Sequence, residues 1–238
     1  MLQHRTSNKP ILYLASQSPR RKALLGRLRR PFQIVRSTHR EVIRRNLSPS
    51  VNAMRNAIGK ARRAKLPHSA TGLVIGADTF LYVRRKFAGA NFRIRGQGVG
   101  CYGYVIGKPK TMREAHRLLR VLSGKSHWVY TGLCLRDAAS GCERASFDKT
   151  QVTFKRLPPE AITRLFRRAS PLDLAGGYAI QHDRGELIAR IKGSRSNVIG
   201  LPLELLRREL QQFRPQASDD RPEELDPAVA VCGVRPAA

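Results

Sequence analysis

Short apolar runs alternate along the chain with stretches in which apolar residues recur at helical spacing. Residues 11–15 form an apolar run of strand length. Ser18 and Pro19 then favour the start of a helix, because serine caps helix N-termini and proline suits the first helical position. The same patterns predict strands at 32–35, 72–76, 128–135, 151–154 and 187–191 and helices at 51–63, 111–122, 159–168 and 202–213.

The helix after Thr111 has clear signals at both ends. Thr111 and Glu114 have the spacing of a capping box, and Gly124 follows the last apolar position. Strands and helices alternate along the chain without an internal repeat. This order predicts an α/β protein with a central mixed β-sheet.

Two segments depart from this alternation. Residues 87–104 are crowded with glycine and lack a helical pattern, so we expect an inserted Gly-rich loop or hairpin. Residues 214–238 contain four prolines and five acids with almost no apolar periodicity, which is typical of a disordered tail.

The net charge of the chain is +28, and it is unevenly distributed. Residues 1–110 contain 24 Lys and Arg residues but only two acids, Glu41 and Asp78. Such an excess of positive charge indicates attraction to an anion such as nucleic acid, a nucleotide or an acidic lipid. Two carboxylates that remain in so basic a segment are candidates for specific functions.

The turn between the first strand and the first helix reads Ser16-Gln17-Ser18-Pro19-Arg20-Arg21. Free N–H groups at a helix N-terminus favour phosphate, and hydroxyl and guanidinium groups add further donors. The pattern therefore fits a phosphate-binding turn. It fits equally an ordinary capped helix with solvated arginines.

Asp78 follows the apolar run at 72–76, and we expect it at the carboxyl end of that strand, where ligands bind in open α/β sheets. A carboxylate there can hold a divalent cation or take a proton from water, and Glu41 is available to share this work. Lys60 and Lys108 are candidate counter-charges for phosphate.

Other motifs are weaker. Residues 98–103 match G-x-G-x-x-G by letters, but the residues that follow do not form a helical pattern, which argues against a dinucleotide site. The four cysteines and six histidines lack the spacings of redox motifs and zinc hydrolases. Neither a signal peptide nor a membrane-spanning run is visible, so we expect a cytoplasmic protein that does not contact a membrane.

Several longer segments resemble the Maf-type nucleoside triphosphate pyrophosphatases, also called septum-formation-inhibitor-like proteins. The matching segments are residues 12–21, 74–79, 107–109, 122–127, 131–132, 171–181 and 193–202. They occur in the family's order over residues 11–211, which we take as one Maf-like domain. Several matches in the right order are far more specific than any single motif.

The resemblance implies hydrolysis of a nucleoside triphosphate to the monophosphate and pyrophosphate with a divalent cation, Mg²⁺ or Mn²⁺. It implies an elongated, two-lobed α/β fold of the Maf/ITPase-like type, with a central mixed β-sheet and a cleft between the lobes. It also implies a homodimer. The insertion at 87–104 lengthens the family's spacing between Asp78 and Lys108 by 18 residues.

The family's functional positions fall on particular residues of this chain. By similarity, Asp78 is the base that activates water, and Glu41 and Asp78 hold the metal. The residues that would bind the substrate and its phosphates are Ser16, Arg20, Arg21, Lys60, Lys108 and Gln181. Gln181 resembles the branch of the family that acts on dTTP and UTP, and a glutamine amide can pair with a pyrimidine edge.

The charge supports a second hypothesis, a basic nucleic-acid-binding or regulatory protein on a degenerate Maf fold. The sequence favours the enzyme, because the few acids lie where hydrolysis needs them. Aromatic residues make up only 6% of the chain, and no aromatic ladder for stacking bases is visible. We expect weak nucleic-acid binding through the basic surface as a side property.

Overall fold

The computed structural model describes residues 10–84, 97–99, 103–168, 170–172 and 174–214. The predicted insertion at 87–104 lies mostly outside the described residues, and the predicted tail at 214–238 lies outside them after its first residue. No helix in the described ranges is long and apolar enough to span a membrane.

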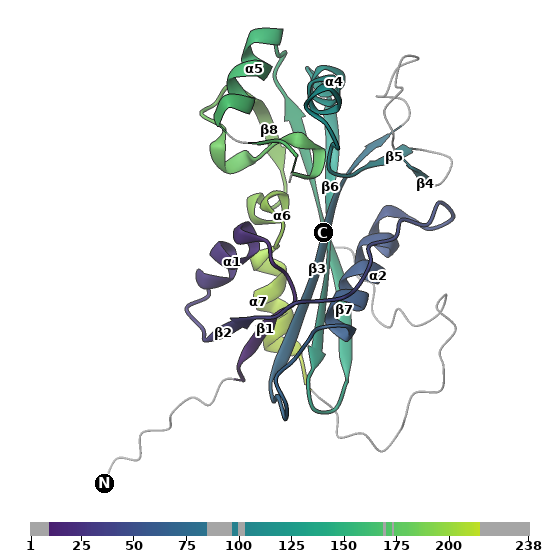
Figure 1. Cartoon of the computed structure of the whole chain (residues 1–238), viewed down its shortest axis with the longest axis vertical. Helices are drawn as coiled ribbons and strands as arrows, with labels where there is room; N and C mark the ends of the chain where they lie inside the picture. The colour runs from purple at the N-terminus through teal and green to yellow at the C-terminus, as the bar shows by residue number, and fades with distance from the viewer. Residues whose placement is uncertain (1–9, 85–96, 100–102, 169, 173, 215–238) are drawn as a thin grey trace.

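A mixed β-sheet with the strand order β2-β1-β3-β6-β7-β8 runs along the molecule (Figure 1). Its strands are β1 (Leu12–Leu14), β2 (Phe32–Ile34), β3 (Leu73–Arg84), β6 (Ser126–Asp137), β7 (Glu143–Phe154) and β8 (Ile188–Lys192). In addition, β5 (Gly103–Ile106) pairs with β3, and β4 (Gln97–Val99) pairs with β5. Only β1 pairs in parallel, with β2 and β3, so the prediction of a mixed α/β sheet is confirmed.

Helices cover both faces of this sheet. They are α1 (Pro19–Gly26), α2 (Pro49–Arg62), α4 (Met112–Leu122), α5 (Pro159–Arg168), α6 (Arg195–Ile199) and α7 (Leu203–Gln212), with 3-10 turns η2 (Ala175–Gly177) and η3 (Ile180–His182). Figure 1 shows an elongated molecule in which α1, α2 and α7 lie toward one end of the long strands and α4 and α5 lie at the other. The long strands therefore connect two halves that have separate helices.

Alternate residues of β3 pack against different helices, because successive side chains of a strand point to opposite faces. Ile75 packs in a cluster with Leu24 of α1 and Leu206 of α7. Val74 packs in another cluster with Ala57 of α2. In the other half, a third cluster joins β3, β6 and β7 to α4 and α5.

Two glycines let α2 lie directly on the sheet. A Cβ atom on Gly76 would collide with the backbone of Ala57, and one on Gly132 would collide with the backbone of Ala53. Gly132 is the register partner of Asp78. Because the helix approaches the strands so closely, polar side chains of α2 reach Asp78.

Three elements differ from the sequence prediction. β3 continues to Arg84 and does not end before Asp78, because β6 pairs with it along ten consecutive residues, 73–82. β7 begins at Glu143 rather than at 151, since its first half is only partly buried and has no clear apolar alternation. The short helix α6 lacks the apolar periodicity that marks the longer helices, and the sequence did not predict it.

Candidate functional site

The site lies at a break in one edge of β3. β1 pairs with residues 73–75 of β3, and β5 pairs with residues 81–84 on the same edge. Asp78 and Thr79 lie between these pairings. Asp78 is inside its own strand but beyond the carboxyl end of β1, the parallel neighbour of β3, and of β2, which pairs with β1. The expected position at the end of its strand is therefore wrong, although the loops that follow β1 and β2 do surround it.

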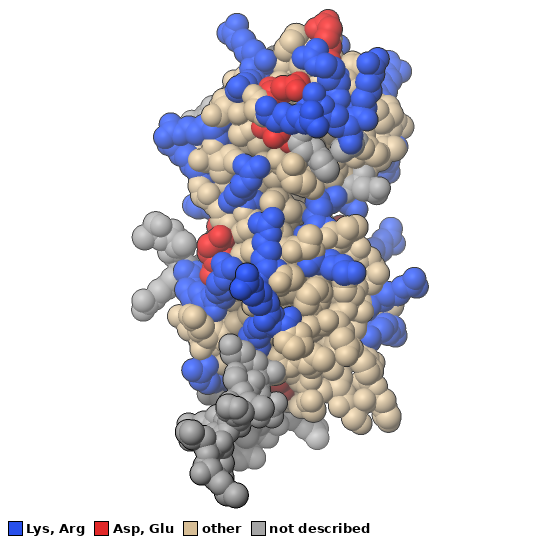
Figure 2. All heavy atoms as spheres, turned by 90° about the vertical axis from the view of Figure 1, so that its left-hand side faces the viewer, with Lys and Arg blue, Asp and Glu red and all other residues tan. Residues whose placement is uncertain are grey.

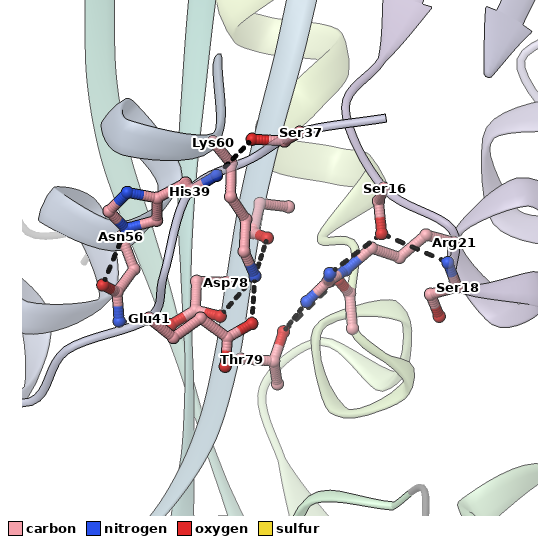
Figure 3. Close-up of polar contacts among 12 residues, drawn as sticks. Ser16, Ser18, Arg21, Ser37, His39, Glu41, Asn56, Lys60, Asp78 and Thr79 are labelled. Atoms are coloured by element: carbon pink, nitrogen blue, oxygen red, sulfur yellow. Dashed lines mark hydrogen bonds and ion pairs between the residues drawn. The ribbon is translucent and has the colours of Figure 1, made fainter. Parts of the chain in front are cut away.

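Asp78 and Thr79 point to opposite faces of the sheet, as neighbours in a strand must. Figure 3 shows one cluster of polar side chains around Asp78 and a second around Thr79 and Arg21. The two clusters lie on either side of the open edge of β3.

Lys60 of α2 holds the first cluster together. Its Nζ donates to Asp78 Oδ1 at 2.7 Å, to Glu41 Oε1 at 2.6 Å and to the backbone oxygen of Ala77 at 3.2 Å. The side chains of Lys60 and Asp78 are only 10% and 6% exposed, whereas that of Glu41 is 59% exposed. The cluster is thus a buried ion pair with a second carboxylate that faces solvent (Figure 3).

Glu41 keeps its negative charge in this setting. Partial burial acts to raise the pKa of Glu41, but the charge and hydrogen bond of Lys60, with the charge of Arg21, outweigh it. The pKa of Glu41 is held below its usual value. At neutral pH, Glu41 is therefore an anion that can ligate a cation.

Asn56 of α2 connects Asp78 to the segment that carries Glu41. Its Nδ2 donates to Asp78 Oδ2 at 2.8 Å, while its Oδ1 accepts from the backbone N–H of Val42 at 3.0 Å and from His39 Nε2 at 3.2 Å. An amide oxygen only accepts hydrogen bonds, so His39 Nε2 must carry a hydrogen. Asn56 thereby fixes the positions of both carboxylates.

Sequence reasoning missed Asn56, although a signal was present. Asn52, Asn56 and Lys60 recur every fourth residue on one face of α2, and all three are buried. Polar residues on the buried face of an amphipathic helix require partners, because an unpaired buried polar group is costly. Such a row is a marker for a polar site.

Arg21 holds the second cluster together. Its guanidinium donates from Nε to the backbone oxygen of Gly200 at 2.8 Å, from Nη1 to Ser16 Oγ at 3.1 Å and from Nη2 to Thr79 Oγ1 at 3.1 Å. Thr79 Oγ1 also lies 3.0 Å from Thr131 Oγ1. One arginine thus joins the turn after β1, the middle of β3 and the end of α6.

The turn that carries Ser16 leads into α1 as expected. Ser18 is the N-cap and Pro19 is the first helical residue, and the backbone N–H of Ser18 donates to Ser16 Oγ at 3.3 Å. Burial lowers the pKa of Arg21, and the charges of Asp78 and Glu41 oppose this shift. Arg20 lies close enough to Arg21 to add to the lowering. The turn therefore places cationic and hydroxyl donors beside the carboxylates.

Lys108 and Gln181 are not part of these clusters. Both side chains are exposed, Lys108 two residues after β5 and Gln181 in η3. Within the described ranges, no hydrogen bond or ion pair joins either residue to Asp78 or Arg21. The structure thus brings together Ser16, Arg21, Glu41, Lys60 and Asp78.

The open edge of β3 is thus flanked by two carboxylates on one side and by an arginine-bearing turn on the other. The family model described as "Maf-like protein" matches residues 11–213. This chain belongs to the Maf family, which confirms the prediction from the sequence segments.

Curated relatives share most of their length with this chain. The "dTTP/UTP pyrophosphatase" of Moorella thermoacetica is 40% identical over 192 residues, covering 81% of this chain and 89% of the relative. Proteins with the same name from Bacillus cytotoxicus and Alkaliphilus oremlandii are 36% and 35% identical. Their matches cover 86% and 81% of this chain and 96% and 90% of the relatives.

Proposed function

We propose that this protein hydrolyses nucleoside triphosphates, with dTTP, UTP or modified pyrimidine nucleotides as substrates, to the monophosphate and pyrophosphate. The observation that carries the proposal is the position of Asp78 between Lys60 and Asn56 at the open edge of β3. The names of the relatives supply the substrate class.

Asp78 is the base in this reaction. An ionised carboxylate offers about four lone-pair sites, so the bonds from Lys60 and Asn56 leave sites that can accept from a water. The water oxygen attacks the α-phosphorus, its proton moves to Asp78, and the α,β-anhydride bond breaks to release pyrophosphate. Lys60 and Asn56 fix the carboxylate so that no reorganisation is needed at the moment of attack.

The substrate phosphates lie against the turn after β1 in this proposal. Ser16, Arg20 and Arg21 provide hydroxyl and guanidinium donors at the N-terminal end of α1. Lys108 reaches the phosphates from the other side of the break in β3, and Gln181 binds the pyrimidine edge. The positive charges oppose the negative charge that develops on the leaving pyrophosphate.

Glu41 and Asp78 would hold a divalent cation in this proposal. Their carboxylates lie close together, because one oxygen of each accepts from Lys60 Nζ, at 2.6 and 2.7 Å. Mg²⁺ typically takes one or two carboxylates and completes its shell with water and substrate phosphates. Bound there, Mg²⁺ or Mn²⁺ would neutralise phosphate charge.

We further propose that the protein acts as a cytoplasmic homodimer. Light scattering of the purified chain tests the dimer, since a monomer mass at micromolar concentration would contradict it.

Pyrophosphate release tests the activity. The substrates are dTTP, UTP, CTP, GTP, ATP, 5-methyl-UTP and 7-methyl-GTP, each with Mg²⁺ or Mn²⁺. We expect pyrimidine turnover that falls by about a thousandfold in Asp78→Asn, because the amide cannot take a proton. Glu160→Gln, which removes an exposed carboxylate of α5, is the control and keeps full activity.

Two results contradict the proposal. Undiminished turnover in Asp78→Asn would exclude Asp78 as the base. No turnover of any nucleotide by the unaltered chain would favour the basic binding protein on a degenerate fold.

A further inference from the structure

A row of arginines lies on α4, outside the site described above. α4 turns its apolar residues to the core, namely Ala115, Leu118, Leu119 and Leu122. On its exposed side it carries Arg113, Arg117 and Arg120, which we call the α4 arginine row. Figure 2, which faces the α1 and α5 side of Figure 1, shows Lys and Arg side chains spread over the molecule, with a few acids among them at the upper end.

The α4 arginine row has no acidic partners among the described residues. Arginines in the other half of the molecule do pair, since Arg62 and Arg136 both bind Glu143. On α5, Arg164 and Arg168 share Glu186. The row is thus a run of three exposed positive charges along one face of α4.

The spacing of the row makes these charges unfavourable for the isolated helix. Arg113 and Arg117 are four residues apart, and Arg117 and Arg120 are three apart, so all three lie on neighbouring positions of one face. Like charges at these spacings destabilise a helix. An anion bound along the row would relieve the repulsion.

His116 and Val121 lie beside the row on α4. The ring of His116 packs edge to face against Phe166 of α5, with 4.7 Å between the ring centroids. This contact joins α4 to α5 next to the row.

We propose that the α4 arginine row binds the phosphate backbone of a nucleic-acid duplex without reading its sequence. From Arg113 to Arg120 the helix rises roughly 10 Å, which spans about three phosphates of one strand. The exposed large hydrophobic residues of the described chain include no aromatic residue, which favours a duplex over unpaired bases that stack on aromatic rings.

A lipid surface fits this helix less well. An amphipathic helix that binds a membrane inserts its apolar face among the lipids. The apolar residues of α4 are instead buried in the core against β6, β7 and α5. Charge alone is left for binding, which matches a densely charged duplex.

Duplex binding by the full chain tests the proposal. Fluorescence anisotropy of a labelled 20-base-pair duplex, as DNA and as RNA, is measured from 50 to 300 mM KCl. We expect the affinity to fall linearly with salt on logarithmic axes. In the variant with Arg113→Gln, Arg117→Gln and Arg120→Gln, the slope should decrease by about 2.7, since each lost phosphate contact removes about 0.9.

A dispersed triple variant is the matched control. Lys65→Gln, Arg190→Gln and Arg207→Gln remove the same charge from exposed positions after α2, in β8 and in α7. This control should keep the slope of the unaltered chain. Both variants should keep its rate of nucleotide hydrolysis, and neither should melt at a lower temperature, which separates this proposal from the enzymatic one.

Three results would overturn the proposal. They are equal loss of slope in the row variant and the dispersed control, absence of salt-dependent duplex binding at 50 mM KCl, and binding to vesicles with 30% phosphatidylserine in place of the duplex.

Discussion

Asn56 donates a hydrogen bond to Asp78 Oδ2 at 2.8 Å, and with the oxygen of the same amide it holds the backbone N–H of Val42 at 3.0 Å. One buried side chain thus orients the candidate base and anchors the segment that carries Glu41. The geometry of both carboxylates depends on a residue that need not touch the substrate.

Asn56→Leu therefore lowers kcat more than it changes KM. The carboxylate of Asp78 loses one of its two fixed donors, and the segment around Val42 loses its anchor. We expect kcat to fall about 10- to 100-fold, in the range seen when a supporting contact of a catalytic group is removed. Steady-state kinetics with UTP measure the effect.

Asn52→Leu is the control for this prediction. Asn52 is also buried on α2, but it binds the backbone of Arg44, Leu47 and Ser48, away from Asp78. It should lower stability by about 1–3 kcal/mol, as expected for a broken buried network, and keep kcat. Equal losses of kcat in the two variants would refute a positioning role for Asn56.

Lys60→Met should destabilise the fold strongly at neutral pH. It leaves the buried Asp78 without its ion-pair partner, and breaking such a pair typically costs about 3–5 kcal/mol. Urea unfolding at pH 7 measures the loss. Lys65→Met, at an exposed position just after α2, is expected to change stability by less than about 0.5 kcal/mol.

The same variant should show a defined pH dependence. The pKa of Glu41 is below its usual 4.5 in the folded chain, largely through Lys60, so its contribution to stability is present above that value and is lost as pH falls. The advantage of the unaltered chain over Lys60→Met therefore shrinks below pH 4.5. An advantage that stays constant from pH 7 to pH 3.5 would contradict this coupling.

Arg21→Lys should raise the KM for the nucleotide. It should also raise the inhibition constant of pyrophosphate. A guanidinium donates in three directions and joins Gly200, Ser16 and Thr79, whereas a lysine amine cannot reproduce this planar fork. We expect kcat/KM to fall about 10- to 100-fold. Arg27→Lys, at the exposed end of α1, is the control, and a similar loss there would point to the helix as a whole.

The parts of the fold that the sequence predicted are those with strong local signals. The capping box at Thr111 is one, since Thr111 Oγ1 accepts from the N–H of Glu114 at 3.1 Å, and the Glu114 carboxylate accepts from Lys110 N–H at 2.8 Å. The first half of β7 has no such signal, because its residues are only partly buried. Its strand conformation depends on pairing with β6, which is a tertiary contact.

The candidate site follows the same division. The charge count singled out Glu41 and Asp78, and in the structure both carboxylates accept hydrogen bonds from Lys60 Nζ. The roles of Asn56 and of the Gly200 carbonyl depend on contacts between elements distant in sequence. A backbone oxygen carries no mark in the sequence at all, so Gly200 could be found only from the structure.

Gly76→Ala should disturb the site through packing. A Cβ atom there collides with the backbone of Ala57, so α2 must move away from β3 and carry Lys60 and Asn56 with it. Overpacking of this kind costs about 1–3 kcal/mol. Thermal unfolding and kcat measure both effects. Gly26→Ala adds a Cβ atom to open space at the end of α1 and should leave both unchanged or raise stability slightly.

The free energy of unfolding should fall in mild acid because His127 is buried in its neutral form. Burial lowers its pKa from 6.5 to about 3, and its Nε2 lies 2.8 Å from the hydroxyl of Tyr178. Between these two pH values the unfolded chain binds a proton that the folded chain does not, so stability falls as pH falls. For one such group the slope approaches about 1.4 kcal/mol per pH unit.

His127→Gln isolates this contribution, because glutamine can still bind the Tyr178 hydroxyl but does not titrate. Urea unfolding at pH 6, 5 and 4 should show a shallower decline for His127→Gln than for the unaltered chain. The carboxylates titrate alike in both proteins and cancel in the difference. His68→Gln removes an exposed histidine, and its free energy of unfolding should decline with pH as that of the unaltered chain does. If the stability of His127→Gln falls with pH as steeply as that of the unaltered chain, then His127 takes up a proton in the folded state and is not held neutral by burial.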